Sequence, residues 1–424
     1  MKILYVCPFA HYAGHFPWAA VHETQALARA GVEVKLLTFR GVIDKAEVKV
    51  PQLTVRQHIR LAVPLYHVAN LLRKCKGISF ACMSLEYFLT LCVAIRLKQK
   101  LSCNIIHLRD GEPFLFLPHL LSLPLRGQNW AVSLIDINLV TLATHPSLLT
   151  DLRKSFRAFL YTLTIGILNS NLWRPVYRMS LSRNHFIFLT QNKEMKQSLE
   201  SYMQGALVGK VFCLPPGIDD TERVISKEEA RRYFGLPQDK PVFLSFGSLH
   251  TGKDVETIFR ALKYMPDVFL LHGGDPVFRL NLPSPENLAE KYDMKDRAIL
   301  RDYYIPEEEK PYYFLAADAI ILSYTKQFLS TASLLWEACR FELPVIASDN
   351  GQLRELVETF RPGLVFAAQD PDSLRQAVSR FINLKPGEVR KLKENCRRFT
   401  NEFSMDKWAQ KCLEIYDRLL ADKS

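Results

Sequence analysis

The stretch YTKQFLSTASLLWEACRFELPVIASDNG, residues 324–351, combines a polar loop, a helix with one carboxylate and a strand introduced by Pro344. The apolar run at residues 317–324 predicts another buried strand, so the loop connects the carboxyl end of a strand to the amino end of a helix. Free backbone N–H groups and the helix dipole attract anions at such a junction. The stretch therefore predicts a parallel α/β sheet with an anion site at residues 330–333.

Glu337 is the carboxylate of this helix. Helical spacing places it on one side with Ser333 and Arg340. Pairing with Arg340 alone would contribute only about 0.2–0.5 kcal/mol, so both a surface ion pair and a ligand contact remain open. The opposite, apolar side of the helix consists of Leu334, Leu335, Ala338 and Phe341.

The length and composition indicate a folded protein of two domains. The chain has 424 residues, of which 48% are hydrophobic and 23% charged, and domains usually hold 50–250 residues. No stretch approaches the roughly 20 apolar residues of a spanning helix, and the first residues form a strand without a signal-peptide pattern. We expect a cytoplasmic protein that can contact the inner face of a membrane.

The cysteine pattern and the net charge limit the kinds of ligand that we expect. The nine cysteines include no C-x-x-C pair, a pattern of reduced core thiols, so we expect no metal site. Lys and Arg outnumber Asp and Glu by 55 to 44, a net charge of +11, which suits nucleotide diphosphates, anionic lipid surfaces or nucleic acid. Because no nucleic-acid-binding motif is present, we do not expect nucleic acid as a partner.

The first half begins with a βαβ pattern. A strand at residues 3–9, a helix ending at Gly31 and a strand at residues 32–39 follow one another. The first turn contains only Gly14 and lacks G-x-G-x-x-G, which argues against a nicotinamide cofactor. Further strands are predicted at residues 104–108, 130–135 and 185–190, with helices between residues 51 and 100.

The basic and aromatic segment at residues 153–178 permits two interpretations. One is a buried helix pair with basic ends, and the other is a surface that faces a membrane or an acceptor.

Strands and helices alternate throughout the second half, which predicts a second parallel sheet covered on both faces. Ligands of such sheets bind at the carboxyl ends of the strands, so two such halves would share a cleft. The predicted strands are residues 242–249, 268–274, 298–304, 317–324, 344–348 and 363–368, and the predicted helices are residues 253–265, 307–316, 352–358 and 372–383.

Six short motifs in order resemble the family-four retaining nucleotide-sugar glycosyltransferases with the GT-B fold. They are the opening strand with Gly14, PPGIDD at residues 215–220, FGSLHTGKDVETIFRAL at residues 246–262, YYFLAADAIILSY at residues 312–324, WEACRFELPVIASDNG at residues 336–351, and FSMDKWAQKCLEIYDRLL at residues 403–420.

The resemblance implies a fold and an activity. The fold would be GT-B, with a Rossmann-like acceptor-side domain at residues 1–205, a nucleotide-sugar donor domain at residues 206–403, and a last helix at residues 404–424 that packs back on the first domain. The activity would be transfer of a sugar, with retention, from a UDP- or GDP-linked donor to an acceptor hydroxyl without metal or cofactor. The acceptor, whether a glycan, a lipid-linked glycan or a small molecule, stays open.

The resemblance also assigns site residues. Lys253 would stabilise the departing diphosphate, and Glu337 would hold the ribose, so these two are the expected catalytic residues. The expected donor contacts are Gly247, Ser248, Lys253, Ser330, Thr331, Ala332, Ser333 and Glu337, and the expected acceptor-side residues are Gly14, His15, His107, Asp110 and Asp136.

Lys253 also has a physical argument. We expect it in the first turn of a helix capped by Thr251, where a lysine opposes the helix dipole by about 0.3–1 kcal/mol, so a bound diphosphate would explain its presence. On the acceptor side, an ordinary ion pair between Arg109 and Asp110 is an equal alternative to a ligand contact.

The chain departs from the family pattern at four positions. Leu329 replaces the first glutamate of E-x7-E, Ser248 replaces an arginine, Glu342 replaces a glycine, and a first-domain histidine is missing beside Asp136. Two alternatives therefore stay open: a catalytically silent GT-B protein that binds a glycan or partner, and a GT-B sugar-nucleotide epimerase.

Overall fold

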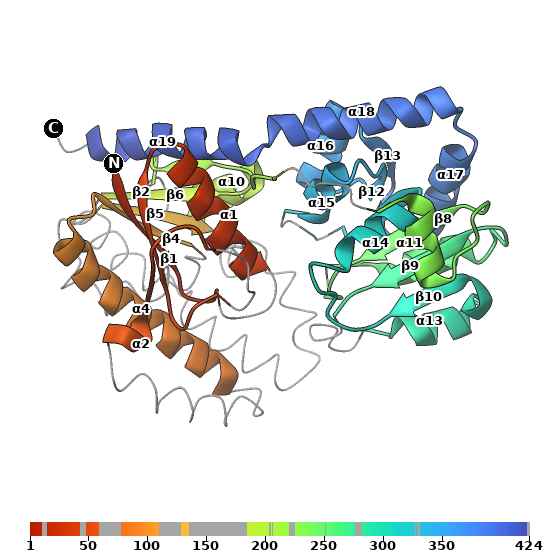
Figure 1. Cartoon of the computed structure of the whole chain (residues 1–424). Coiled ribbons are helices and arrows are strands. Elements are labelled where there is room, and N and C mark those ends of the chain that lie inside the picture. The colour runs from red at the N-terminus through yellow and green to blue at the C-terminus, as the bar shows by residue number, and fades with distance from the viewer. Residues whose placement is uncertain are drawn as a thin grey trace. The chain divides into compact units, whose positions relative to one another are not determined.

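The computed structural model describes residues 1–10, 15–42, 48–58, 78–109, 129–134, 185–202, 205, 207–219, 225–250, 252–275, 282–326, 328 and 331–421. The expectations for Gly14, Asp110, Asp136, Thr251, Leu329, Ser330 and the segment 153–178 lie outside these residues. The chain divides into an N-terminal unit, Met1–Gly217 with Met405–Ser424, and a C-terminal unit, Ile218–Ser404 (Figure 1).

The N-terminal unit is built on a seven-stranded sheet in the order β3-β2-β1-β4-β5-β6-β7, and every pairing is parallel. The strand order reverses between β1 and β4, the position at which parallel sheets open to a ligand. The strands are β1 (Lys2–Cys7), β2 (Glu33–Thr38), β3 (Gln52–Thr54), β4 (Ile105–Leu108), β5 (Asn129–Leu134), β6 (His185–Thr190) and β7 (Val211–Cys213).

Helices cover both faces of this sheet. The buried side chains of α1 (His15–Arg29) and α19 (Met405–Ala421) form one core with the sheet. Those of α4 (Ile78–Leu101) and α10 (Lys193–Tyr202) form the core on the other face. The short α2 (Val55–His58) follows β3. Among the described helices, none is both long and apolar enough to span a membrane.

The C-terminal unit contains a six-stranded sheet in the order β10-β9-β8-β11-β12-β13, again parallel at every pairing. Its four inner strands are almost entirely buried, as expected for a sheet covered on both faces, and the edge strands β10 and β13 are mostly half-buried. The strands are β8 (Val242–Phe246), β9 (Phe269–Gly273), β10 (Ala298–Arg301), β11 (Ala319–Leu322), β12 (Val345–Ser348) and β13 (Gly363–Phe366).

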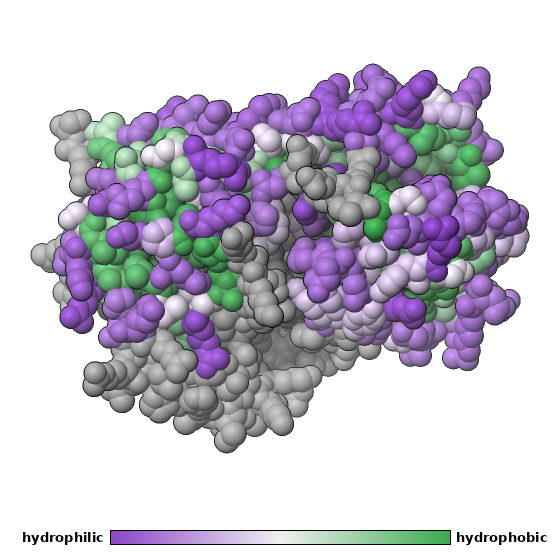
Figure 2. All heavy atoms as spheres, in the orientation of Figure 1, coloured by the Kyte–Doolittle hydropathy of each residue, from purple (hydrophilic) through white to green (hydrophobic). Residues whose placement is uncertain are grey.

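Two groups of helices cover this second sheet. One core contains side chains of α11 (Lys227–Phe234), α14 (Lys310–Ala316), α15 (Leu334–Arg340), α16 (Gly351–Phe360) and α18 (Pro386–Glu402). The other core contains those of α12 (Val255–Leu262), α13 (Pro285–Lys291) and α17 (Pro371–Ile382), and a short 3₁₀ turn, Lys295–Arg297, precedes β10. Hydrophilic side chains cover the side of α18 seen in Figure 2.

The unit boundary lies later in the chain than residue 205. The strand β7 pairs with β6, with Phe188 opposite Val211, and so belongs to the first sheet. The closing helix α19 is part of the N-terminal unit, where Trp408 is buried and Arg29 of α1 pairs with Asp406 at 3.0 Å. The last helix therefore contributes to the core of the first domain.

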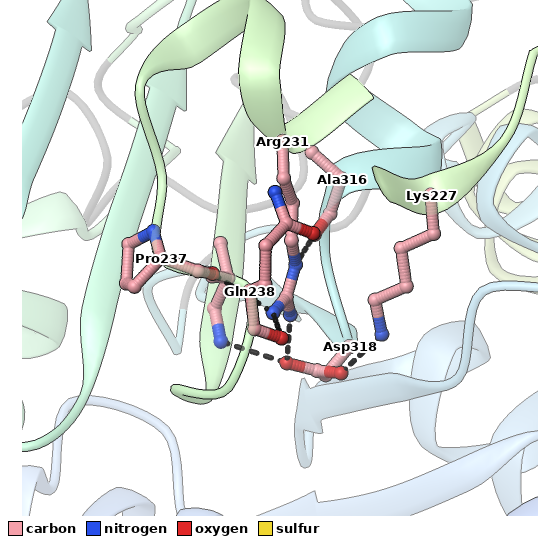
Figure 3. Close-up of polar contacts among 7 residues, drawn as sticks. Lys227, Arg231, Pro237, Gln238, Ala316 and Asp318 are labelled. Carbon is pink, nitrogen blue, oxygen red and sulfur yellow. Dashed lines mark hydrogen bonds and ion pairs between the residues drawn. The ribbon is translucent and has the colours of Figure 1, made fainter. Parts of the chain in front are cut away.

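A buried charge cluster holds the C-terminal unit together (Figure 3). The carboxylate of Asp318 pairs with Arg231 at 2.8 Å and with Lys227 at 2.5 Å, and it accepts a hydrogen bond from the backbone N–H of Val242 at 2.8 Å. This joins α11 to the first residues of β8 and β11. The Arg231 guanidinium also donates to the carbonyl oxygens of Pro237, Gln238 and Ala316.

Glu342, one of the departures from the family pattern, has a backbone reason. Its φ of 51° lies in the left-handed region that favours glycine. Its side chain forms a two-pronged ion pair with Arg397 of α18, at 2.6 and 2.9 Å. The glycine of the pattern is therefore replaced here by a residue that ties the turn before β12 to α18.

Candidate functional site

Glycines bring the backbone close together at the carboxyl ends of β8 and β9. Gly247 has a φ of 88°, and its N–H donates to the carbonyl of Gly273 at 2.8 Å. A Cβ atom on Gly247 would lie 2.9 Å from the Nζ atom of Lys253, and one on Gly274 would clash with the carbonyl oxygen of Gly247. Both positions need glycine, which leaves the end of the sheet open to a ligand.

Lys253 does not lie in the first turn of a helix, which corrects the expectation from the sequence. The helix α12 begins at Val255, and Asp254 caps it by accepting from the Thr257 N–H at 3.2 Å and from the Thr257 hydroxyl at 2.6 Å. Asp254 is a better N-cap than the expected Thr251, so the helix starts later. Lys253 belongs to the loop before the helix and does not oppose its dipole.

The loop holds the Lys253 ammonium inward. Its Nζ atom donates to the backbone carbonyl of Phe246, and the loop is fixed to β11 because Asp254 N–H donates to Ser323 at 3.0 Å. Burial lowers the pKa of Lys253 to about 7. Within the described chain no carboxylate lies at ion-pair distance from the Lys253 ammonium. The ammonium can therefore pair with an anionic ligand.

His250 is a neighbour that the sequence analysis did not single out. Its Nδ1 atom accepts from the Gly252 N–H at 3.1 Å, and its ring lies 6.0 Å from that of Phe328. Burial, and then the charge of Lys253, lower the pKa of His250 to about 4. A neutral ring therefore stands beside the lysine at physiological pH. In the sequence, the position of His250 between Ser248 and Lys253, two expected donor contacts, could have indicated that it lies at the site.

The start of α15 packs over the same glycine. A Cβ atom on Gly247 would lie 3.5 Å from Cδ1 of Leu334, the first residue of α15. Ser333 is the N-cap residue and is exposed, although its side chain makes no capping bond. Ala332 is buried, and the Thr331 hydroxyl donates to Gln352 at 3.1 Å. The structure thus brings Gly247, Lys253 and the start of this helix together.

Glu337 lies one turn further along α15 than Ser333, and its N–H donates to the Ser333 carbonyl at 3.2 Å. Its carboxylate lies 3.3 Å from Arg340 and 3.6 Å from Lys310, and a fifth of the side chain is exposed. Burial alone would lower the pKa of Lys310, but the carboxylates of Glu337 and Glu307 raise it overall. Since an ionised carboxylate offers about four acceptor positions, Glu337 retains capacity for a hydroxyl ligand.

His107 is an interior residue, and this corrects its expected place on the acceptor side. It is fully buried, with Nε2 at 2.6 Å from the Ser133 hydroxyl and Nδ1 in a hydrogen bond with the Tyr416 hydroxyl. Burial, helped by Arg109, lowers the pKa of His107 to about 3. The neutral ring ties β4 to β5 and to α19. His15, the first residue of α1, is the other described member of that group.

Arg109 pairs with Glu23 of α1 at 2.9 Å, and both side chains are almost fully buried. Glu23 also accepts from the Tyr5 hydroxyl. Burial raises the pKa of Glu23, although Arg109 and Tyr5 oppose that rise. The pair and Ser133 line a cavity of about 10 Å³, which is room for one water molecule. The alternative ion pair between Arg109 and Asp110 stays a prediction, because Asp110 lies outside the described residues.

Potential metal ligands do not gather in the described parts of the chain, where no three His, Cys, Asp or Glu side chains cluster. The residues that come together are instead glycines, a lysine, a histidine and a helix start, all in the C-terminal unit. These are groups that bind phosphate through N–H donors and a cation.

Two Rossmann-like parallel-sheet units define the GT-B fold, and comparison with solved structures agrees. Sucrose-phosphate synthase from Thermosynechococcus elongatus matches with a TM-score of 0.67 and 18% identity, over 99% of both chains. Anabaena HepE in complex with UDP and glucose matches with a TM-score of 0.65 and 14% identity, over 99% of this chain and all of that one.

Sequence comparison finds a family model and curated relatives that match part of the chain. Residues 226–399 match the model of the glycosyl transferases group 1, a stretch that lies within the C-terminal unit. D-inositol 3-phosphate glycosyltransferase of Mycolicibacterium paratuberculosis is 26% identical over 218 residues, covering 50% of this chain and 48% of that protein. The chain spans about half the length of the curated relatives that it matches.

Proposed function

We propose that the protein is a retaining glycosyltransferase that moves a sugar from a nucleotide diphosphate sugar, UDP- or GDP-linked, to an acceptor hydroxyl without a metal ion. One observation carries the proposal. The desolvated ammonium of Lys253, the glycine at position 247 and the start of α15 lie together at the carboxyl end of the second sheet. This unit also holds the stretch that matches the glycosyl transferases group 1.

Lys253 would act on the leaving group. Departure of a nucleoside diphosphate places negative charge on the β-phosphate, and a fixed ammonium stabilises that charge without metal. In the free site the pKa of Lys253 is about 7. The negative charge of a bound diphosphate would raise this pKa and so keep the lysine protonated. The leaving phosphate would then take the proton of the acceptor hydroxyl, so no separate base is needed.

Glu337 would hold the ribose hydroxyls of the donor. Its two ion-pair contacts, at 3.3 and 3.6 Å, fix the carboxylate without saturating it. Solved relatives of the fold carry nucleotides, among them HepE with UDP-glucose and a starch synthase domain from Arabidopsis thaliana with ADP. These neighbours support a nucleotide-linked donor. Which nucleotide base the donor carries has to be measured.

The first experiment is calorimetric titration of the full chain with UDP, GDP and ADP. We expect one nucleotide to bind, and we expect Lys253→Met and Glu337→Gln each to weaken it by roughly tenfold or more, since hydrogen bonds to charged groups contribute about 1.5–3 kcal/mol. Lys295→Met is the matched control, because Lys295 is an exposed lysine of the same unit that pairs with Glu290. Absence of binding at millimolar nucleotide would contradict the proposal.

Transfer is tested next with the sugar form of the nucleotide that binds. NMR of the product reports whether the anomeric configuration is retained, and a chelator in the assay tests for metal. Conversion of the donor without any acceptor would instead support the epimerase. Leu329, at the place of the family's first glutamate, supports the silent alternative, in which nucleotide binding or transfer is absent.

A further inference from the structure

Exposed tyrosines gather in one region of the C-terminal unit. Among the described residues, the large hydrophobic side chains that are exposed include Tyr233 at 52%, Tyr303 at 43% and Tyr304 at 39%. Tyr233 lies in the last turn of α11, and the other two follow β10 in the loop that leads to α14. Two separate parts of the chain therefore place aromatic rings on the surface near each other.

One ring stack and the bonds of Glu309 link Tyr233, Tyr312 and Tyr303, and Tyr304 follows Tyr303 directly in the chain. Tyr233 stacks on Tyr312 of α14 with centroids 4.4 Å apart and an interplanar angle of 30°. The Tyr303 hydroxyl donates to Glu309 at 3.1 Å. Burial, and then the charges of Glu309 and Tyr303, raise the pKa of Tyr233, so these groups sense one another and the Tyr233 phenol stays protonated. We call Tyr233, Tyr303, Tyr304 and Tyr312 the tyrosine surface.

The tyrosine surface rests on a rigid base. The ring of Tyr233 meets the edge of Phe234 at 4.9 Å, Phe234 packs on the buried Tyr313 at 4.6 Å, and Tyr313 packs on Phe246 at 5.3 Å. Phe246 ends β8 and supplies the carbonyl that holds Lys253. Rings fixed in this way lose little conformational entropy when a ligand stacks on them, which favours recognition.

The charges at the tyrosine surface select among ligands that stack on aromatic rings. Asp302 precedes the pair of exposed tyrosines, and three consecutive glutamates, residues 307–309, follow them. Against these four carboxylates stand three cations: Arg301, the exposed Arg232 beside Tyr233, and Lys310, which pairs with Glu307 at 2.5 Å. Nucleic-acid bases also stack on aromatic rings, but nucleic acid is an anion, as is an anionic lipid surface. The surplus of carboxylates repels both.

A neutral sugar chain fits both properties. Each pyranose ring has an apolar face of C–H groups, which suits the negative face of an aromatic ring. Its rim of hydroxyls suits carboxylates, because hydrogen bonds to a charged acceptor are the stronger ones. We propose that the tyrosine surface binds a neutral oligosaccharide chain, with the rings stacking on the sugars and Glu307–309 accepting from their hydroxyls. The idea that this surface holds the acceptor or the product of transfer rests on the proposed function. Binding of the oligosaccharide itself requires no nucleotide-sugar donor.

The test is binding of the labelled full chain to an array of neutral gluco-, galacto- and manno-oligosaccharides and of sialylated ones. We expect neutral chains to bind and sialylated chains to bind more weakly. Tyr233→Ala with Tyr303→Ala should reduce binding by roughly 5- to 150-fold, since stacked aromatic contacts contribute about 0.5–1.5 kcal/mol each. Tyr303→Phe, which keeps the ring, should retain most of the binding.

Tyr264→Ala is the matched control. Tyr264 is 65% exposed in the same unit, lies after α12 and packs under Lys263, so its loss should leave glycan binding unchanged. Failure of wild type to bind any neutral chain, or undiminished binding by the double variant, would overturn the inference. So would loss of nucleotide affinity or a changed sedimentation coefficient in the double variant without any glycan binding, since these would assign the rings to the donor or to self-association.

Discussion

The two units of the chain differ most in charge. Residues 1–217 and 405–424 contain 29 Lys and Arg against 15 Asp and Glu, a net charge of +14. Residues 218–404 contain 26 against 29, a net charge of −3. The basic character of the protein therefore belongs to the N-terminal unit alone.

The difference separates two kinds of recognition. The unit that matches the glycosyl transferases group 1 is nearly neutral, and one of its cations, Lys253, lies without a carboxylate partner among the described residues at the carboxyl end of the sheet. The basic unit instead spreads charge over a whole domain, which raises the local concentration of anionic partners rather than fixing one ligand. This distribution is the reason to test an anionic membrane surface as a partner.

The largest expected effect compares the buried ion pairs of the two units. Arg231→Met should destabilise the C-terminal unit by about 3–5 kcal/mol, because three carbonyl groups lose a buried charged donor and Asp318 keeps only Lys227 and the Val242 N–H. Arg109→Met should cost less, about 1–3 kcal/mol, because Glu23 already has a raised pKa and can become protonated. Urea unfolding followed by hydrogen exchange assigns each loss to a unit. Equal losses would contradict this ranking.

The next effect is the pH dependence of nucleotide binding. Above pH 7 the free site loses the ammonium of Lys253, so affinity should fall by up to roughly tenfold per pH unit until the pKa of the bound state is reached. Calorimetry from pH 6 to 9 measures this. In Lys253→Met the fall above pH 7 should disappear, and a fall that persists would assign the titration to another group.

The lowered pKa of Lys253 also predicts how the stability of the protein changes with pH. Because its pKa is lowered from 10.5 to about 7 in the folded protein, the unfolded chain binds more protons between these values. The contribution of Lys253 to stability therefore rises with pH from about 7 to 10.5, and Lys253→Met should remove that rise. Urea unfolding at pH 7 and pH 9.5 in both proteins checks it.

A smaller effect tests the charge asymmetry. We expect the full chain to float with vesicles containing phosphatidylserine at low salt and to be released at high salt, since each basic residue near such a surface contributes about 1 kcal/mol. Arg153, Lys154 and Arg157 changed together to Gln should weaken flotation. The matched control changes Arg390, Lys391 and Lys393 of α18 to Gln. If the control weakens flotation as much, the N-terminal unit is not the membrane-facing one.

The smallest effect concerns Glu342. Glu342→Gly removes left-handed strain of about 1–2 kcal/mol, but it also removes the ion pair with Arg397 and adds flexibility to the unfolded chain. We expect a change in the free energy of unfolding within about 1 kcal/mol. A loss above 2 kcal/mol would show that the ion pair dominates the turn.

The alternation of apolar strands and helices was readable from the sequence. Strand β6 falls at the predicted residues 185–190, and all six strands of the second sheet were predicted with ends within a few residues. The helix α18 and strand β7 were not predicted. The former is strongly charged with few apolar residues, and the latter is a three-residue strand without its own pattern, so only packing reveals them.

The sequence by itself determined the two-sheet α/β architecture and a set of site residues, because apolar period, turn glycines and motif order are local properties. Only the tertiary structure decided which of them meet. It placed Gly247 under Leu334 and beside Lys253, moved Lys253 out of the helix because Asp254 caps it, and buried His107 against Tyr416, 309 residues away. Burial and long-range pairing set the pKa of each group, and neither property is written in the order of neighbouring residues.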